Sequence, residues 1–112
     1  MRNDDRVRLQ HMIEAGESAI DFVSGRVRAD LDGDRMLLFA LVRALEIVGE
    51  AAHKISDETR ATLPAIPWPA IVGMRNRLIH AYFEVDPQLV WQAATVELPA
   101  LLPKLRELVG SK

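Results

Sequence analysis

The fold class is decided by residues 36–55, which read MLLFALVRALEIVGEAAHKI. Leu, Ala, Val and Ile dominate this stretch, and it contains one glycine and no proline. Residues of this kind favour a helix, and a helix so rich in apolar side chains belongs inside a protein. Asp30-Leu-Asp-Gly-Asp34 precedes it and supplies turn and N-cap residues. We therefore expect a central, mostly buried helix from Met36 to Ile55.

Further helices are predicted on both sides of this stretch. Apolar residues recur at three- and four-residue intervals from Asp4 to about Val27, which is helical periodicity. The segment Ser56-Asp-Glu-Thr59 resembles a cap followed by a short helical turn, and three prolines then hold a loop around Trp68. The remaining predicted helices run from Pro69 or Ala70 to about Phe83, from the Asp86-Pro87 cap to Leu98, and from Leu101 to Val109 as a bent continuation or a short fifth helix. No strand-like alternation occurs.

The sequence thus predicts an all-α protein, an antiparallel four-helix bundle with a kinked or short fifth C-terminal helix. A chain of 112 residues with 49% hydrophobic residues fits a single domain over residues 1–112. A net charge of −2 excludes a broadly basic surface, so any nucleic-acid binding must rest on a local patch. The absence of cysteine excludes disulfides and thiolate zinc sites. The charged N-terminus is no signal peptide and no apolar stretch reaches membrane-spanning length, so we expect a cytoplasmic protein without a membrane partner.

Residues 74–83, which read MRNRLIHAYF, carry the candidate chemistry. Arg75 can neutralise a phosphate with a fixed fork of donors, and His80 can exchange a proton near neutral pH. On an ideal helix the two positions are about 140° apart, so their side chains converge only if the arginine curls, the helix distorts or a second subunit contributes. The alternative is that Arg75 and Arg77 are solvated charges, His80 an interfacial residue and Tyr82 a packing residue.

Other candidate motifs are weaker. Glu50-Ala-Ala-His53 has the spacing of a di-iron ligand pair, but the second Glu-x-x-His that such sites need is missing. Residues 30–34 resemble the start of a calcium loop, but the position twelve residues along is Leu41 rather than glutamate. Trp68 and Trp91 are more often core anchors than base-stacking platforms. Five basic side chains are further candidates for guiding RNA, although such residues are more often simply solvated: Arg26, Arg28, Arg60, Lys104 and Arg106.

The motif closely resembles the signature of HepT-like toxins in the HEPN superfamily, in which an arginine is followed by four residues, a histidine, one residue and a tyrosine. The pattern Arg43-Ala-Leu-Glu46-Ile-Val-Gly-Glu50 also resembles the second helix of that family. The resemblance implies a metal-independent endoribonuclease without a cofactor. It also implies that the protein is a homodimeric toxin of a two-gene, type VII-like toxin-antitoxin module.

The resemblance assigns a role to each motif residue. His80 would deprotonate a ribose 2′-hydroxyl or protonate the leaving 5′-oxygen, and Arg75 would stabilise the charge on phosphorus. In similar systems a minimal nucleotidyltransferase antitoxin adds AMP to the motif tyrosine, here Tyr82. Asn76 could hold the imidazole or a phosphate oxygen, and Glu46 or Glu50 could orient Arg75 from the neighbouring helix.

Two questions stay open from the sequence. The RNA substrate could be tRNA or mRNA. The alternative function is a non-catalytic HEPN module that binds nucleotide or docks a nucleotidyltransferase.

Overall fold

The computed structural model describes residues 1–80 and 85–110, with side chains for residues 1–78 and 85–110. Every regular element in these ranges is a helix. The elements are α1 (Asn3–Val23), α2 (Asp30–Gly33), α3 (Arg35–Lys54), α4 (Asp57–Ala61), α5 (Trp68–His80), α6 (Pro87–Gln92), the π-helix η1 (Ala93–Glu97) and α7 (Leu98–Gly110).

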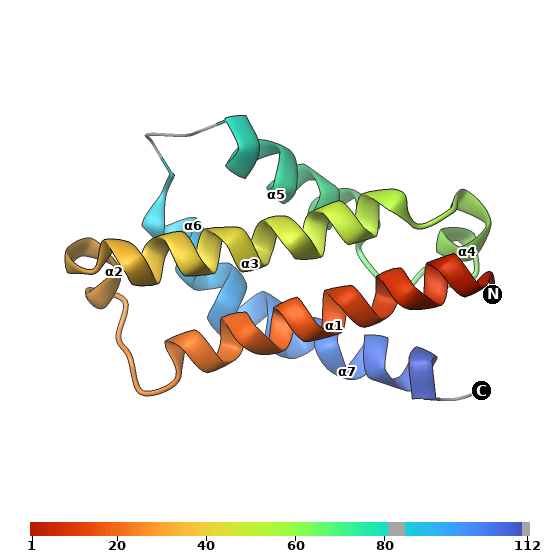
Figure 1. The fold of residues 1–112 in the computed structure, drawn as a ribbon, viewed down its shortest axis with the longest axis horizontal. Helices are drawn as coiled ribbons and strands as arrows, with labels where there is room; N and C mark the ends of the chain where they lie inside the picture. Colours follow the sequence, from red (N-terminus) through yellow and green to blue (C-terminus); the bar gives the residue numbers. More distant parts are fainter. Residues whose placement is uncertain (81–84, 111–112) are drawn as a thin grey trace.

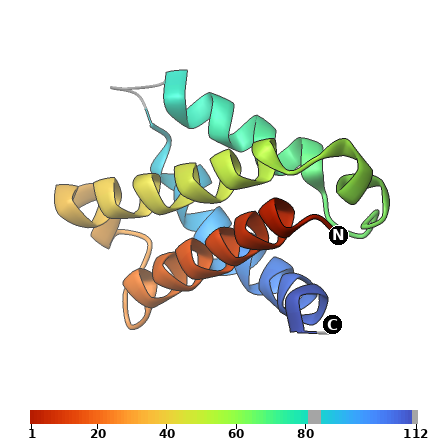
Figure 2. The same cartoon turned by 45° about the vertical axis from the view of Figure 1, so that its right-hand side comes forward.

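The central helix is α3, which packs against α1 on one side and α5 on the other (Figures 1 and 2). Helix α7 packs against α1 on the side away from α5. The helices α1, α3 and α5 alternate in direction, and the start of α1 and the end of α7 lie at the same end of the molecule (Figure 1). The predicted all-α antiparallel bundle is therefore confirmed.

The core lies around α1, between it and the helices α3 and α7 that pack against it. Leu9 and Met12 of α1, Leu41 of α3, and Leu102 and Leu105 of α7 are among the largest fully buried side chains. The apolar residues of α1 and α3 recur at helical spacing, which places them on one face of each helix. The expectation that the helix over residues 36–55 is central and largely buried is confirmed.

The first helix is shorter than the sequence pattern predicts. It ends at Val23 rather than Val27, and the Ser24 backbone N–H donates to the Asp21 carbonyl. Gly25 then adopts a φ of 75°, a left-handed conformation that glycine tolerates best. The chain turns here and forms the single helical turn α2, after which the Asp34 side chain accepts a hydrogen bond from the Leu37 N–H and caps α3.

The C-terminal segment is one continuous helical run from Pro87 to Gly110. Asp86 caps it and Pro87 occupies the first helical turn, as predicted. Pro99 lacks an N–H and its ring conflicts with the carbonyl four residues earlier, so regular α-helical bonding cannot pass through it. The preceding segment is a π-helix, in which the Leu98 N–H reaches the Ala93 carbonyl. Of the two predicted alternatives, the structure supports a continuation rather than a separate fifth helix.

A buried carboxylate ties the start of α1 to α4. Asp5 is only 2% exposed and accepts hydrogen bonds from the Ser56 N–H, the Ser56 hydroxyl and the Thr59 hydroxyl at 3.0, 2.6 and 2.6 Å. Burial alone raises the pKa of Asp5, but the hydrogen bonds from Ser56 and Thr59, helped by the charge of Arg2, outweigh burial and lower the pKa to about 2. Ser56 also caps α4, so one cluster fixes both helix starts.

Candidate functional site

The helix that carries the motif, α5, is anchored at its start by a tryptophan. Trp68 is buried, and its indole N–H donates to the Leu63 carbonyl at 3.2 Å. Pro69 follows at the second position of the helix, where a missing N–H costs nothing. The interpretation of Trp68 as a core anchor is therefore confirmed.

Helix α5 lies in close contact with α3 where Arg75 crosses Gly49. A Cβ placed on Gly49 would overlap the Arg75 Cβ, and it would lie 2.8 Å from the Arg75 Cγ and 3.3 Å from the Arg75 Cα. Only glycine leaves room for the backbone of α5 at this point. The sequence analysis did not single out Gly49, although it lies within the pattern from Arg43 to Glu50.

The contact with α3 leaves the Arg75 side chain half-buried. Its Nη1 donates to the Asn76 Oδ1 at 3.0 Å. Its Nε is buried and makes no hydrogen bond within the described part of the chain. This guanidinium is held by packing on α3 and by Asn76, and at least one of its N–H donors has no partner within the described chain. Such a group is suited to binding an anionic ligand.

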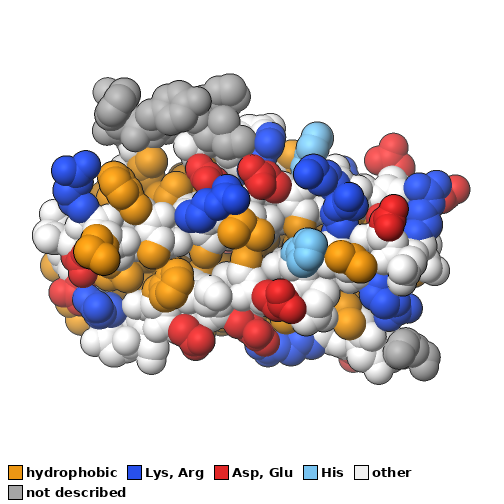
Figure 3. Space-filling view, in the orientation of Figure 1, with side chains coloured by type: hydrophobic (Ala, Val, Ile, Leu, Met, Phe, Trp, Pro, Cys, Tyr) orange, Lys and Arg blue, Asp and Glu red, His pale blue; other side chains and the backbone are white. Residues whose placement is uncertain are grey.

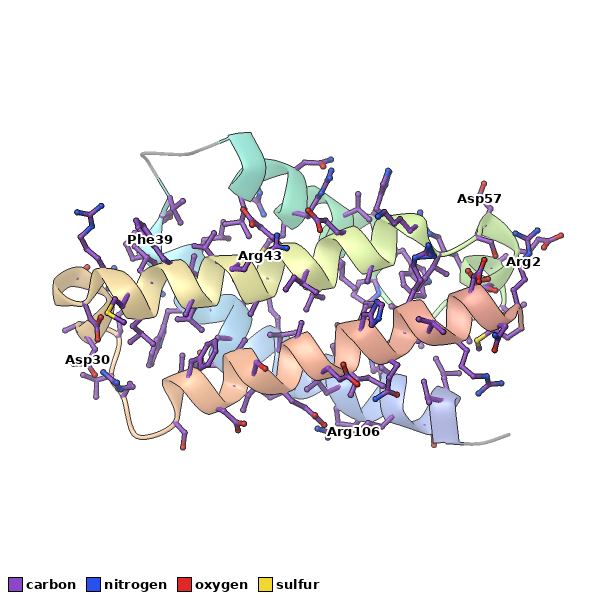
Figure 4. All side chains as sticks on the ribbon, viewed as in Figure 1. Arg2, Asp30, Phe39, Arg43, Asp57 and Arg106 are labelled. Carbon is purple, nitrogen blue, oxygen red and sulfur yellow. The ribbon has the colours of Figure 1, made fainter. Side chains whose placement is uncertain are left out.

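The two predicted supporting carboxylates flank Gly49 along α3. Glu46 and Glu50 are both half-buried, and Glu46 forms an ion pair with Arg43 at 3.5 Å. Among residues 1–78 and 85–110, no ion pair joins Arg75 to either glutamate. Both carboxylates therefore lie on α3, the helix that Arg75 contacts, but Glu46 pairs with Arg43 rather than with Arg75. Figure 4 shows Arg43 on α3, beside α5.

The motif histidine follows Arg75 on the same helix. The α5 backbone extends to His80, whose side chain is outside the described set, and Tyr82 lies outside the described residues. Helical register puts position 80 one turn after Asn76 and about 40° around the axis from it. The convergence of Arg75 with His80, and the role of Tyr82, stay predictions.

The basic residues proposed as possible RNA guides are all engaged within the chain. Arg60 donates to the Ala52 and His53 carbonyls at 2.8 Å each and so satisfies the end of α3. The other four have acidic or backbone partners: Arg26 with Asp34, Arg28 with Asp32, Arg106 with Glu17, and Lys104 with the Ala65 carbonyl. On the face that Figure 3 draws, positive and negative side chains are intermixed rather than gathered into a continuous basic patch.

The described part of the chain holds no cluster of three or more His, Cys, Asp or Glu residues that could hold a metal ion. It does contain a cavity of about 330 Å³ beside α5. Apolar residues from α3, α5, α6, η1 and α7 form most of its walls, and Arg77 and Glu97 add one charge of each sign.

These features can be set beside known proteins. A family profile described as Ribonuclease HepT-like matches residues 12–108, which includes all of α3 and α5. The chain belongs to the HepT-like ribonuclease family. The predicted resemblance to this family is therefore confirmed.

Relatives of similar length support the family assignment. A candidate RNase of Caldanaerobacter subterraneus is 37% identical over 101 residues, which is 90% of each chain. A candidate HepT ribonuclease of Thermococcus cleftensis is 35% identical over 108 residues, covering 96% of this chain and 98% of the relative. A candidate RNase of Methanocaldococcus jannaschii is 33% identical over 100 residues, covering 89% of this chain and 92% of the relative.

No solved structure matched the chain. In the described residues, every helix is too short or too polar to cross a lipid bilayer.

Proposed function

We propose that this member of the HepT-like family is a metal-independent endoribonuclease that uses Arg75 and His80. The observation that carries the proposal is the placement of Arg75, which is half-buried on Gly49 and hydrogen-bonded to Asn76, five residues before the motif histidine. A guanidinium fixed by packing loses little freedom when it binds a phosphate, so its charge is ready for the transition state.

The chemistry proceeds by attack of a ribose 2′-hydroxyl on the adjacent phosphorus. His80 removes the 2′-hydroxyl proton or gives a proton to the leaving 5′-oxygen, while Arg75 neutralises the charge that builds on the phosphoryl oxygens. The new bond joins the 2′-oxygen to phosphorus and the bond to the 5′-oxygen breaks, so one product ends in a 2′,3′-cyclic phosphate. Asn76 keeps its amide nitrogen for a phosphate oxygen or the imidazole, since its carbonyl oxygen already accepts from Arg75.

Cleavage of total RNA in EDTA tests this mechanism. We expect wild-type protein to cut RNA under these conditions, with His80→Ala lowering the rate by roughly 10²–10⁴-fold and Arg75→Ala by roughly 10²–10³-fold. His53→Ala and Arg106→Ala serve as matched controls, since both residues are exposed and lie outside α5. Activity that survives both motif substitutions, or that needs a divalent ion, contradicts the mechanism. Weaker nucleotide binding without RNA cleavage favours the non-catalytic alternative.

The proposal includes a homodimer, because a second copy would resolve the angular separation of Arg75 and His80. The exposed apolar residues Met36 and Phe39 offer a docking surface at the start of α3. At helical spacing they share a face with Arg43, Glu46 and Glu50, so a second α3 seated on this face would bring its own polar groups toward the site.

The proposal also includes restraint by a nucleotidyltransferase antitoxin, which transfers AMP from ATP to the Tyr82 hydroxyl and releases pyrophosphate. Bulk and negative charge two residues from His80 would repel an RNA phosphate.

Co-expression with the neighbouring nucleotidyltransferase should increase the mass of the wild-type chain by whole AMP units. Tyr82→Phe should prevent the increase because it lacks the accepting oxygen. Intact-mass spectrometry measures both, and an unchanged mass of the wild-type chain argues against this form of control.

A further inference from the structure

The cavity of about 330 Å³ lies beside the Gly49 crossing, since Val48 of α3 and Ile71 of α5 both line it. Ala70, Met74 and Arg77 line it from α5, and their spacing of four and three residues places them in one row along the helix. On an ideal helix Arg77 lies about 160° around the axis from Arg75. Arg77 therefore reaches the cavity from the flank of α5 opposite Arg75, whereas Ile71 lines the cavity near the contact with α3.

The cavity combines an apolar interior with two charged groups. Leu45 and Val48 of α3, and Leu98 and Leu101 of α7, provide aliphatic walls. Arg77 and Glu97 also line it; both are exposed residues, and no ion pair joins them in the parts of the chain that are described. Pockets of about 300–1,000 Å³ with this composition suit a small ring system with polar edges.

The outer ridge of α5 connects the cavity to the proposed catalytic position. Arg77 lies three residues before position 80, which puts the two positions about 60° apart on an ideal helix. Gly73 lies on the same ridge, and a Cβ placed on it would meet nothing within 4 Å. A polynucleotide backbone could therefore cross the helix over Gly73 without a side chain in its path.

We propose that this cavity binds one base of the RNA substrate, a base close in sequence to the phosphodiester that is cut. The proposal rests on the ribonuclease function proposed above and adds a source of sequence preference. Guanine satisfies the charged groups most fully, because its edge offers adjacent N–H donors to the Glu97 carboxylate and oxygen and nitrogen acceptors to the Arg77 guanidinium. The aliphatic walls then cover the faces of the ring.

Two substitutions test the proposal from different sides. Ala70→Leu fills the cavity from an exposed position on α5, and Glu97→Gln replaces the carboxylate without changing its size. Glu107→Gln is the matched control, since Glu107 is an exposed glutamate of α7 outside the cavity lining. The measurements are calorimetric titration with guanosine 5′-monophosphate and sequencing of the ends produced from a random-sequence RNA pool.

We expect the wild-type chain and Glu107→Gln to bind the mononucleotide equally and to cut beside guanine preferentially. Glu97→Gln should weaken binding by about tenfold, since a hydrogen bond to a charged acceptor is lost, and Ala70→Leu should abolish it. Both substitutions should flatten the base preference of cleavage.

Cleavage without base preference in the wild type, or a preference that both variants retain, overturns the proposal. If the wild type cuts no RNA, the ribonuclease proposal fails. The titration with guanosine 5′-monophosphate then tests separately whether the cavity binds a base. Guanosine monophosphate binding that Glu97→Gln weakens and Ala70→Leu abolishes supports a base pocket, and absence of saturable binding to the wild type rejects it.

Discussion

At the scale of single residues, Asp5 and Arg75 show two ways in which burial fixes a charged group. Asp5 is nearly inaccessible but accepts three hydrogen bonds, so its charged form is stabilised. Arg75 is half-buried with one donor nitrogen unpaired within the described chain, so its charge is less completely satisfied. Asp5 therefore acts in stability, whereas Arg75 is suited to binding an anion.

The Asp5 cluster predicts how stability depends on pH. Its pKa is about 2 in the folded chain against an ordinary value of 3.8, so folding favours the charged carboxylate. The stabilisation is fully present above about pH 4 and is lost as the pH falls toward 2. At about 1.4 kcal/mol per pKa unit, the contribution is about 2 kcal/mol.

Asp5→Asn should lower the free energy of unfolding at neutral pH by an amount of this order, and should flatten its pH dependence between pH 4 and pH 2. Urea unfolding at a series of pH values measures both effects. Asp4→Asn is the control, because Asp4 is the exposed neighbour. Equal pH profiles for Asp5→Asn and the wild type would show that the cluster does not act in this way.

At the scale of elements, the crossing of α3 and α5 determines how the motif helix sits. Gly49 lets the two helices approach until the Arg75 Cα lies 3.3 Å from where a Cβ would be. The Arg75 Cβ, whose position is fixed by the α5 backbone, occupies that space, so a larger residue cannot be accommodated by a change of rotamer alone. Any side chain at position 49 must displace α5 and the arginine on it.

Gly49→Ala should therefore destabilise the fold by roughly 1–3 kcal/mol, the usual cost of overpacking, and should lower RNA cleavage more than the stability loss explains. Gly73→Ala provides the comparison on α5, because a Cβ at that position meets nothing within 4 Å. Alanine favours a helix by about 1 kcal/mol relative to glycine, so the melting temperature of the Gly73→Ala protein should rise. Thermal unfolding and cleavage assays on both variants check this. A Gly49→Ala protein as stable and active as the wild type contradicts the close-packing argument.

At the scale of the whole molecule, large apolar side chains remain exposed at the end where α1 finishes and α3 begins. Met36 is 84% exposed, Phe39 58% and Phe22 39%. Met36 and Phe22 line one shallow hollow, and Figure 4 shows Phe39 near the start of α3. A molecule measuring 42 × 28 × 19 Å can cover such residues by association with a second copy.

If this surface forms the proposed dimer, Phe39→Glu should convert the protein to a monomer by placing a charge in the interface. Light scattering coupled to size exclusion measures the mass, and cleavage of RNA should fall in parallel. Val96→Glu is the matched control, since Val96 is also an exposed apolar residue but lies on η1. A wild-type monomer at working concentration, or a Phe39→Glu dimer, would count against this surface.

The sequence by itself determined what is local in this protein. Helical periodicity predicted α1 and α3, and the side chains of Asp34, Ser56 and Asp86 cap helices as their types and positions indicated. The motif residues identified the family before any geometry was known. Such signals are readable because periodicity and capping act within about one helical turn along the chain. The end of α1 was predicted four residues too late, because apolar spacing continued past a glycine whose left-handed backbone ends the helix.

Only the tertiary structure decided what depends on distant contacts. Asp5 meets Ser56 across 51 residues of sequence, Arg75 crosses Gly49 from another helix, and the cavity draws its walls from α3, α5, α6, η1 and α7. None of these has a periodic signature, because each depends on how close two helices come and at which residue they cross. The separation and the crossing point of two helices are determined by packing of the whole core, because side chains from several helices must fit together at once.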